Sequence, residues 1–114
     1  MFKKLIDKLS GILTRKILSN RNVALKSVQE NGKMLYWAPP EYQNDREIVL
    51  AAVKQNGLAL AYASEELRRD QEVCLAAVSQ DGLALAFVPS DVATQEMADA
   101  AIRKGNVLDH ILKQ

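Results

Sequence analysis

Apolar and polar positions recur along the chain with a period of about 25 residues. Residues 45–69 read DREIVLAAVKQNGLALAYASEELRR, and residues 70–94 repeat both the LAAV and the GLALA of that stretch. A more divergent copy comes before them, and a shorter one follows. Self-similarity at a fixed period of this size is typical of stacked repeat proteins. The sequence therefore predicts one domain over residues 20–114 with about four repeats, at 20–44, 45–69, 70–93 and 94–114.

Each repeat is predicted to contain two short helices. A helix-capping residue opens every copy, and a glutamate follows two positions later in three of them. A glycine recurs where the first helix should end after about eleven residues, and we expect it in the left-handed conformation that helix C-termini favour. A shorter helix is expected at Leu58–Ala63 and Leu83–Val88. The caps are Asn20, Asp45, Asp70 and Thr94, and the glycines are Gly32, Gly57, Gly82 and Gly105.

One face of the first helix is apolar or small in nearly every copy. In the second repeat this face consists of Ile48, Val49, Ala52 and Val53. Positions 50 and 51 point the other way on a helical wheel. They are apolar in the two central copies, whereas Lys26 and Asp99 interrupt the pattern in the outer ones. We therefore expect an all-α array in which the central repeats are sandwiched and the outer ones act as caps, so that the array is complete at about four units.

An amphipathic helix is predicted ahead of the repeats, over residues 2–18. Its apolar residues recur every three or four positions and face away from the basic ones. Residues 1–19 would then pack as a lid on the exposed end of the stack. The alternative is a helix on a membrane surface, with its basic face against anionic lipid. The membrane-facing candidates in that alternative are Phe2, Leu5, Ile6, Leu9, Lys3, Lys4 and Lys8.

Charge is unevenly distributed, although the net charge is only +1. Residues 1–22 carry six basic side chains and one acidic one, while the rest of the chain carries nine basic and thirteen acidic ones. The acidic body would repel phosphate, and no aromatic residues interleave the basic segment, so nucleic-acid binding is not expected. No apolar run approaches the ~18 residues of a membrane span, and charged residues interrupt any secretory signal.

Catalytic, metal and cofactor chemistry is not expected, so we do not expect an enzyme. The chain has no phosphate-binding glycine loop, nucleophile elbow or zinc-ligand spacing. Cys74 falls among small core positions and has no partner for an internal disulfide, which favours a reducing, intracellular compartment. His110 is expected to be an end-cap ring rather than a ligand. Solvated turn positions are expected for the carboxylates Glu41, Glu65, Glu66 and Asp91.

A binding surface is the function that these patterns favour. Tyr36, Trp37 and Tyr42 cluster in the first repeat, and large amphipathic rings near an edge are typical interface anchors. The alternative is that they fill the space between the lid and the first repeat. The leading hypothesis is a protein-interaction module with a protein partner, and the other hypothesis is a peripheral membrane protein held by residues 2–18. The sequence does not specify the oligomeric state.

Residues 45–88 read DREIVLAAVKQNGLALAYASEELRRDQEVCLAAVSQDGLALAFV. This stretch resembles the DUF4116 repeat family, whose members carry D-x-E-(I/V)-V-L-x-A-V-x-x-(N/D)-G-x-A-L-x-(Y/F)-A-S-x-x-L. The similarity is close over 45–87, recognisable over 20–44 and faint after residue 94. It implies a small helical repeat that occurs in arrays, in intracellular bacteria and protists, with no assigned activity and no catalytic residues to transfer. The resemblance is also compatible with a protein that an intracellular bacterium exports as an effector.

Overall fold

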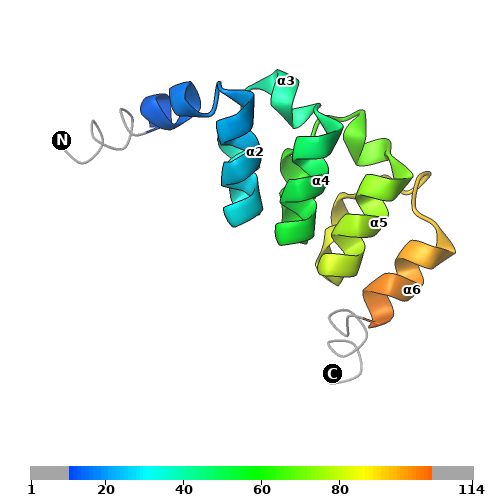
Figure 1. The fold of residues 1–114 in the computed structure, drawn as a ribbon. Helices are drawn as coiled ribbons and strands as arrows, with labels where there is room; N and C mark the ends of the chain where they lie inside the picture. Colours follow the sequence, from blue (N-terminus) through cyan, green and yellow to red (C-terminus); the bar gives the residue numbers. More distant parts are fainter. Residues whose placement is uncertain (1–10, 104–114) are drawn as a thin grey trace, which may run out of the picture.

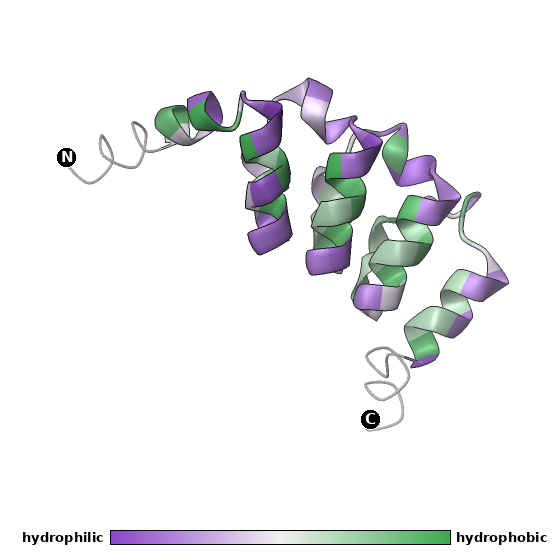
Figure 2. Cartoon of the chain, in the orientation of Figure 1, coloured by the Kyte–Doolittle hydropathy of each residue, from purple (hydrophilic) through white to green (hydrophobic). Residues whose placement is uncertain are grey.

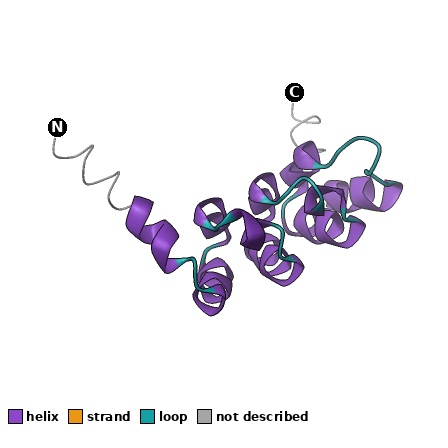
Figure 3. Cartoon of the chain, turned by 90° about the horizontal axis from the view of Figure 1, so that it is seen from above, coloured by secondary structure: helices purple, strands orange, loops and turns teal. Residues whose placement is uncertain are grey.

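The computed structural model describes residues 11–103, and helices account for all of their regular secondary structure (Figures 1 and 3). Three α-helices of ten residues are each followed by a 3₁₀-helix of six residues, and a last α-helix of nine residues ends the described part. The pairs are α2 (Arg21–Glu30) with η1 (Gly32–Trp37), α4 (Arg46–Gln55) with η2 (Gly57–Tyr62), and α5 (Gln71–Gln80) with η4 (Gly82–Phe87), and the last helix is α6 (Gln95–Arg103). The predicted all-α fold is confirmed.

Equivalent helices of successive repeats pack on one another. Helix α4 lies between α2 and α5, and α5 in turn contacts α6. In the same way η2 packs between η1 and η4, so the 3₁₀-helices form a second layer against the α-helices (Figure 1). Short links complete the repeats and contain α3 (Pro40–Gln43) and η3 (Leu67–Arg69). The result is an elongated stack with principal extents of 47 × 31 × 23 Å.

The core follows the face that the sequence predicts for the first helix. In the two central α-helices all four positions of that face are buried, whereas Val23 and Ile102 are exposed at the equivalent places in α2 and α6. Each outer helix has a described neighbour on one side only, which leaves one edge of its apolar face uncovered. The buried central residues are Ile48, Val49, Ala52, Val53, Val73, Cys74, Ala77 and Val78.

The opposite side of the central α-helices differs from the expected sandwich. Leu50, Ala51, Leu75 and Ala76 are only half-buried, although they pack against the core. Neighbouring helices cover these residues along the stack, but nothing in the described chain lies over them. Figure 2 shows the resulting hydrophobic character along α4 and α5, compared with the more hydrophilic α2. The α-helical layer therefore has one open apolar face.

Side-chain caps open the α-helix that begins each of the four repeats, as predicted. Each cap oxygen accepts hydrogen bonds from backbone N–H groups two or three residues later, which have no partner inside the helix. The bonds are those of Asn20 with Asn22 and Val23, Asp45 with Glu47 and Ile48, Asp70 with Val73, and Thr94 with Met97.

The recurring glycines have a different role from the one predicted. The residue that ends each α-helix has extended backbone, and the following glycine begins the 3₁₀-helix outside the left-handed region. A β-carbon on Gly32 or Gly57 would lie under 3.0 Å from the carbonyl oxygen of Ala52 or Ala77, in the α-helix of the next repeat. Glycine is therefore required by the close approach of the neighbouring repeat. Gly105 lies outside the described residues.

Residues 11–17 form a helix, called here the N-terminal helix, that extends from the first end of the stack (Figure 1). Gly11 and Arg15 lie against the ring of Trp37, and Leu18 is buried. In contrast, Ile12, Leu13 and Ile17 are 55, 58 and 51% exposed. Over these residues the apolar stripe does not face the repeats as a lid requires. The lid arrangement stays a prediction for residues 1–10, which lie outside the described residues.

Candidate functional site

A groove of about 780 Å³, called here the first groove, runs between α2 and α4 on the open face. Leu25, Leu50 and Ala51 supply its apolar lining. Arg46 and Glu47 line the groove where α4 begins, and Lys54 lines it near the end of the same helix. An apolar concave surface with charged groups at its ends can hold the apolar side chains of a ligand and orient its polar flanks.

Leu50 lines this groove, whereas its apolar surroundings in the sequence predict a sandwiched position in the packed interior. A signal was present in the same helix. Glu47 and Lys54 lie three residues before and four residues after Leu50, which places all three on one face of the helix. Charged residues at both spacings indicate that this face is open to solvent.

A second groove of about 410 Å³ lies between α5 and α6. Leu75 and Met97 form its apolar lining, and Gln71, Glu72, Thr94 and Glu96 provide the polar groups. Of the described residues, the charged ones that line it are the two glutamates, whereas the first groove has two basic residues and one acidic one. The two grooves therefore differ in charge, and the second has less exposed apolar lining because Met97 is buried.

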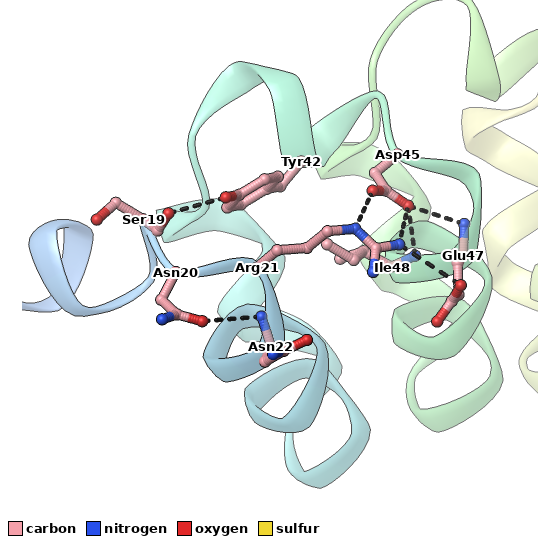
Figure 4. A network of polar contacts seen from close by, with 8 residues as sticks. All are labelled: Ser19, Asn20, Arg21, Asn22, Tyr42, Asp45, Glu47 and Ile48. Carbon is pink, nitrogen blue, oxygen red and sulfur yellow. Dashed lines mark hydrogen bonds and ion pairs between the residues drawn. The ribbon is translucent and has the colours of Figure 1, made fainter.

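Ion pairs connect the N-terminal ends of neighbouring α-helices along this face (Figure 4). Arg21 Nε lies 2.7 Å from Asp45 Oδ2, and the same guanidinium reaches Glu47 at 3.5 Å. One repeat later, Arg46 pairs in the same way with Asp70 and Glu72. Each aspartate is also the cap of its helix, so it joins two repeats. Partly exposed pairs contribute little free energy, and their periodic placement indicates a role in the register of the stack.

The two cap aspartates have depressed pKa values. The hydrogen bond from Arg21 lowers the pKa of Asp45 below its ordinary value of 3.8, against an opposing effect of burial. Burial also opposes the ionisation of Asp70, but the bonds from the Val73 N–H and from Arg46 outweigh it and keep this pKa below 3.8. Both carboxylates are therefore ionised at neutral pH and serve as hydrogen-bond acceptors.

The three aromatic candidates do not form one exposed cluster. Tyr36 is half exposed, and its ring meets those of Trp37 and Tyr62 edge-on, with centroids 4.9 and 5.3 Å apart. Trp37 lies beneath Arg15, whose guanidinium carbon is 5.5 Å from the ring centroid. The Tyr42 hydroxyl donates a hydrogen bond of 2.8 Å to the Ser19 carbonyl (Figure 4). Two of the three rings thus hold the N-terminal segment against the first repeat, and partner binding by this set stays a prediction.

Cys74 is buried in the core, as predicted. Its thiol donates to the Arg68 carbonyl oxygen at 2.9 Å. Burial raises the pKa of this thiol to about 11, and the nearby charge of Asp70 adds to the effect. The thiolate is the reactive form of cysteine, so a thiol held in the protonated form is a poor nucleophile at neutral pH.

The other candidates for chemistry are dispersed. Glu41, Glu65 and Glu66 are exposed in the links, and Asp91 pairs with Arg69. Within residues 11–103 no group of three His, Cys, Asp or Glu side chains is arranged to hold a metal ion. None of the helices in this range has the length and apolar character needed to cross a membrane. His110 and the membrane-facing candidates Phe2, Lys3, Lys4, Leu5, Ile6, Lys8 and Leu9 lie outside the described residues.

Capped α-helices, 3₁₀-helices and glycine contacts that recur from repeat to repeat define a helical-repeat protein. The chain belongs to the family described as "Domain of unknown function (DUF4116)", which it matches over residues 20–68 and again over residues 45–92. The second match begins one repeat after the first, as expected when the matching unit recurs along the chain. The family resemblance is confirmed. No match was found among curated proteins or among solved structures.

Proposed function

We propose that the protein is a non-enzymatic interaction module whose first groove takes a short helical segment of a partner protein. The observation that carries this proposal is the apolar lining of that groove, where Leu25 and Leu50 are half-buried in an open concave surface. Such leucines provide pockets for apolar anchor side chains, which dominate the binding energy of interfaces.

The spacing of the two leucines favours an amphipathic helix as the bound segment. Leu25 and Leu50 belong to packed neighbouring helices, whose axes are about 8–10 Å apart in such contacts. One to two turns of an α-helix, at about 5.4 Å per turn, cover that distance. The partner should therefore present apolar residues at spacings of three, four and seven along one face. Lys54 favours an acidic residue beside that face, since Arg46 is already paired with Asp70 and Glu72.

Leu50→Glu tests the proposal because it places a charge in the apolar lining. A partner captured from lysate by the wild-type protein would be purified and its affinity measured by calorimetry. We expect Leu50→Glu to weaken binding by about tenfold or more, since burial of one leucine contributes about 2 kcal/mol. Leu83→Glu is the matched control, because Leu83 is 53% exposed in the 3₁₀ layer and should not affect this groove.

Two results would contradict this assignment. One is the absence of any partner that binds the purified protein at micromolar concentration. The other is equal loss of binding in Leu50→Glu and Leu83→Glu. If Tyr36→Ala abolishes binding and Leu50→Glu does not, the site lies on the exposed aromatic ring of the first repeat instead.

A second candidate function is attachment to a membrane surface through residues 2–18. It is supported by the exposure of Ile12, Leu13 and Ile17 on a helix that also carries Arg15 and Lys16. Apolar and basic side chains on one helix favour the interface of an anionic bilayer. Co-sedimentation with vesicles rich in phosphatidylserine would test it, and Leu13→Asp should lower binding by about tenfold or more. Absence of binding even at low salt removes this candidate.

A further inference from the structure

We infer that copies of the chain associate head to tail, with the N-terminal helix of one copy docked in the second groove of the next. The proposal concerns α5 and α6, and it does not depend on the function assigned to the first groove. It uses the exposed apolar stripe of that helix and the second groove, which lie at opposite ends of the described stack (Figure 1).

The first surface is the stripe formed by Ile12, Leu13 and Ile17, each more than half exposed. A soluble amphipathic helix normally buries its apolar stripe against another element. Here the first repeat holds the helix from another side, through Trp37 and the buried Leu18. The helix is therefore fixed in direction while its stripe stays free for a second molecule.

The second surface is the groove whose apolar residues are the half-buried Leu75 and the buried Met97, and whose exposed charged residues are Glu72 and Glu96. Its negative charge has a specific origin in the sequence. Arg21 and Arg46 neutralise Glu47 and Glu72 of the following repeats, but Gln71 occupies the equivalent position before Glu96. Among the ion pairs of residues 11–103, none includes Glu96.

The charges of the two surfaces are complementary. Residues 1–22 carry five more basic than acidic side chains, and the remaining chain carries four more acidic than basic ones. Lys16 lies on the N-terminal helix between Ile12 and Leu13 on the helical wheel, while Arg15 lies over Trp37 of its own copy. Among the described residues the second groove offers Glu96, which is in no ion pair, whereas the first groove would oppose a basic residue with Lys54. Opposite charge around an apolar contact favours this pairing over the other groove.

The position of the two surfaces makes the contact one between copies. The N-terminal helix lies at one end of the row of helices, and α6 lies at the other (Figure 1). In a pair, the copy whose N-terminal helix is docked still has a free second groove, and the other copy still has a free N-terminal helix. Such a heterologous contact adds further copies until a ring closes or an open chain forms.

Sedimentation velocity of the full chain tests this arrangement from micromolar to millimolar concentration. We expect the average mass to rise beyond that of a dimer and to fall in molar salt, because the contact is partly electrostatic. Leu13→Asp disables the helix surface, and Glu96→Lys disables the groove surface. Both residues are exposed, so both variants should fold, which circular dichroism checks. Each variant alone should associate at least about tenfold more weakly than the wild type.

Mixing the two variants distinguishes head-to-tail contact from other forms of association. The mixture contains one intact helix surface and one intact groove surface, so it should form one-to-one dimers and nothing larger. Leu83→Asp is the control and should assemble like the wild type. The inference is overturned if the wild type stays monomeric, if Leu13→Asp assembles normally, or if the mixture stays monomeric. A monomeric wild type that binds anionic vesicles through Leu13 would assign the stripe to a membrane surface.

Discussion

The junction between α4 and α5 and the junction between α5 and α6 have the same helical arrangement but different polar contacts. At the inner junction, the Gly57 N–H donates to Gln80 Oε1 at 2.5 Å, and Arg46 pairs with the cap Asp70. The first repeat docks in the same way, since the Gly32 N–H donates to Gln55 Oε1 at 2.6 Å. The two glycine–glutamine bonds lie where each glycine contacts the α-helix of the next repeat.

The outer junction lacks the arginine–aspartate pair. Gln71 stands in place of the arginine, and Thr94 in place of the cap aspartate. The position equivalent to Gln55 and Gln80 is Lys104, which lies outside the described residues. A β-carbon on Gly82 would lie 2.9 Å from the Ala101 carbonyl oxygen, a looser approach than at the other two glycines. Helix α6 therefore packs on α5 without the arginine–aspartate pair that connects the inner repeats.

The largest difference between the junctions should appear on replacing glycine by alanine. Gly57→Ala is expected to destabilise the protein by about 3 kcal/mol, because its β-carbon would overlap the Ala77 carbonyl and separate two repeats. Gly82→Ala should cost about 1 kcal/mol, since the neighbouring helix is farther away. Urea unfolding followed by circular dichroism gives both values. Equal losses would show that the difference in approach has no energetic consequence.

Removing the glutamine acceptor should have the next largest effect. Gln80→Ala leaves the buried N–H of Gly57 without its bond, and an unsatisfied buried donor costs about 2 kcal/mol. Gln29→Ala is the control, because Gln29 is exposed on the open face and should change stability little. Thermal unfolding of both variants checks the prediction. A Gln80 variant as stable as the control would mean that water replaces the glutamine.

The ion pairs should make the inner junctions sensitive to acid. The pKa of folded Asp45 lies below its ordinary value of 3.8, so the stabilisation is present above pH 3.8 and is lost as the pH falls through the folded value. Asp45→Asn should therefore flatten the dependence of the unfolding free energy on pH below 3.8. Arg21→Gln should flatten it as well, because the carboxylate loses its strongest partner. Urea unfolding at a series of pH values measures this dependence. If the unfolding free energy of both variants changes with pH as it does in the wild type, this account is wrong.

Installing the missing pair at the outer junction should have the smallest effect. The double variant Gln71→Arg with Thr94→Asp reproduces the arrangement of Arg46 and Asp70, and we expect a coupling energy of about 0.5 kcal/mol. A double-mutant cycle on urea unfolding isolates this value. The single variant Gln71→Arg also places a positive charge in the second groove, so it should weaken head-to-tail association. A coupling energy of zero would mean that α6 is too far from α5 for the pair to form.

Much of the fold could be predicted from the sequence, because each repeat begins with a helix-capping residue that acts on N–H groups close to it in the chain. Asn20, Asp45 and Asp70 cap N–H groups only two or three residues away, so their residue type is informative without knowledge of the fold. A second set of caps was missed although it recurs as regularly. Asn31, Asn56 and Asp81 accept bonds from N–H groups two residues later and begin the 3₁₀-helices.

The candidate site was harder to predict, because it depends on contacts between repeats. A glycine recurs at the position of Gly57 in each repeat, which indicates that this position requires glycine. The Ala77 carbonyl that imposes the requirement belongs to the next repeat. Leu50 is an apolar residue in an apolar stretch, as core residues usually are. Only the curvature and spacing of the stacked helices leave it at the edge of a groove. Tyr36, Trp37 and Tyr42 are close together in the sequence, but their hydrogen-bond and ring partners depend on the tertiary structure.

The sequence by itself determined the repeat period, the helix starts and the apolar face of each helix, because these follow from interactions within about one helical turn or from periodicity. The tertiary structure decided how closely successive repeats approach and which leucines remain open to solvent. It also decided the direction of the N-terminal helix, whose stripe at Ile12, Leu13 and Ile17 points away from the repeats that the same chain supplies. These properties depend on the distances between residues about 25 positions apart, which no local pattern specifies.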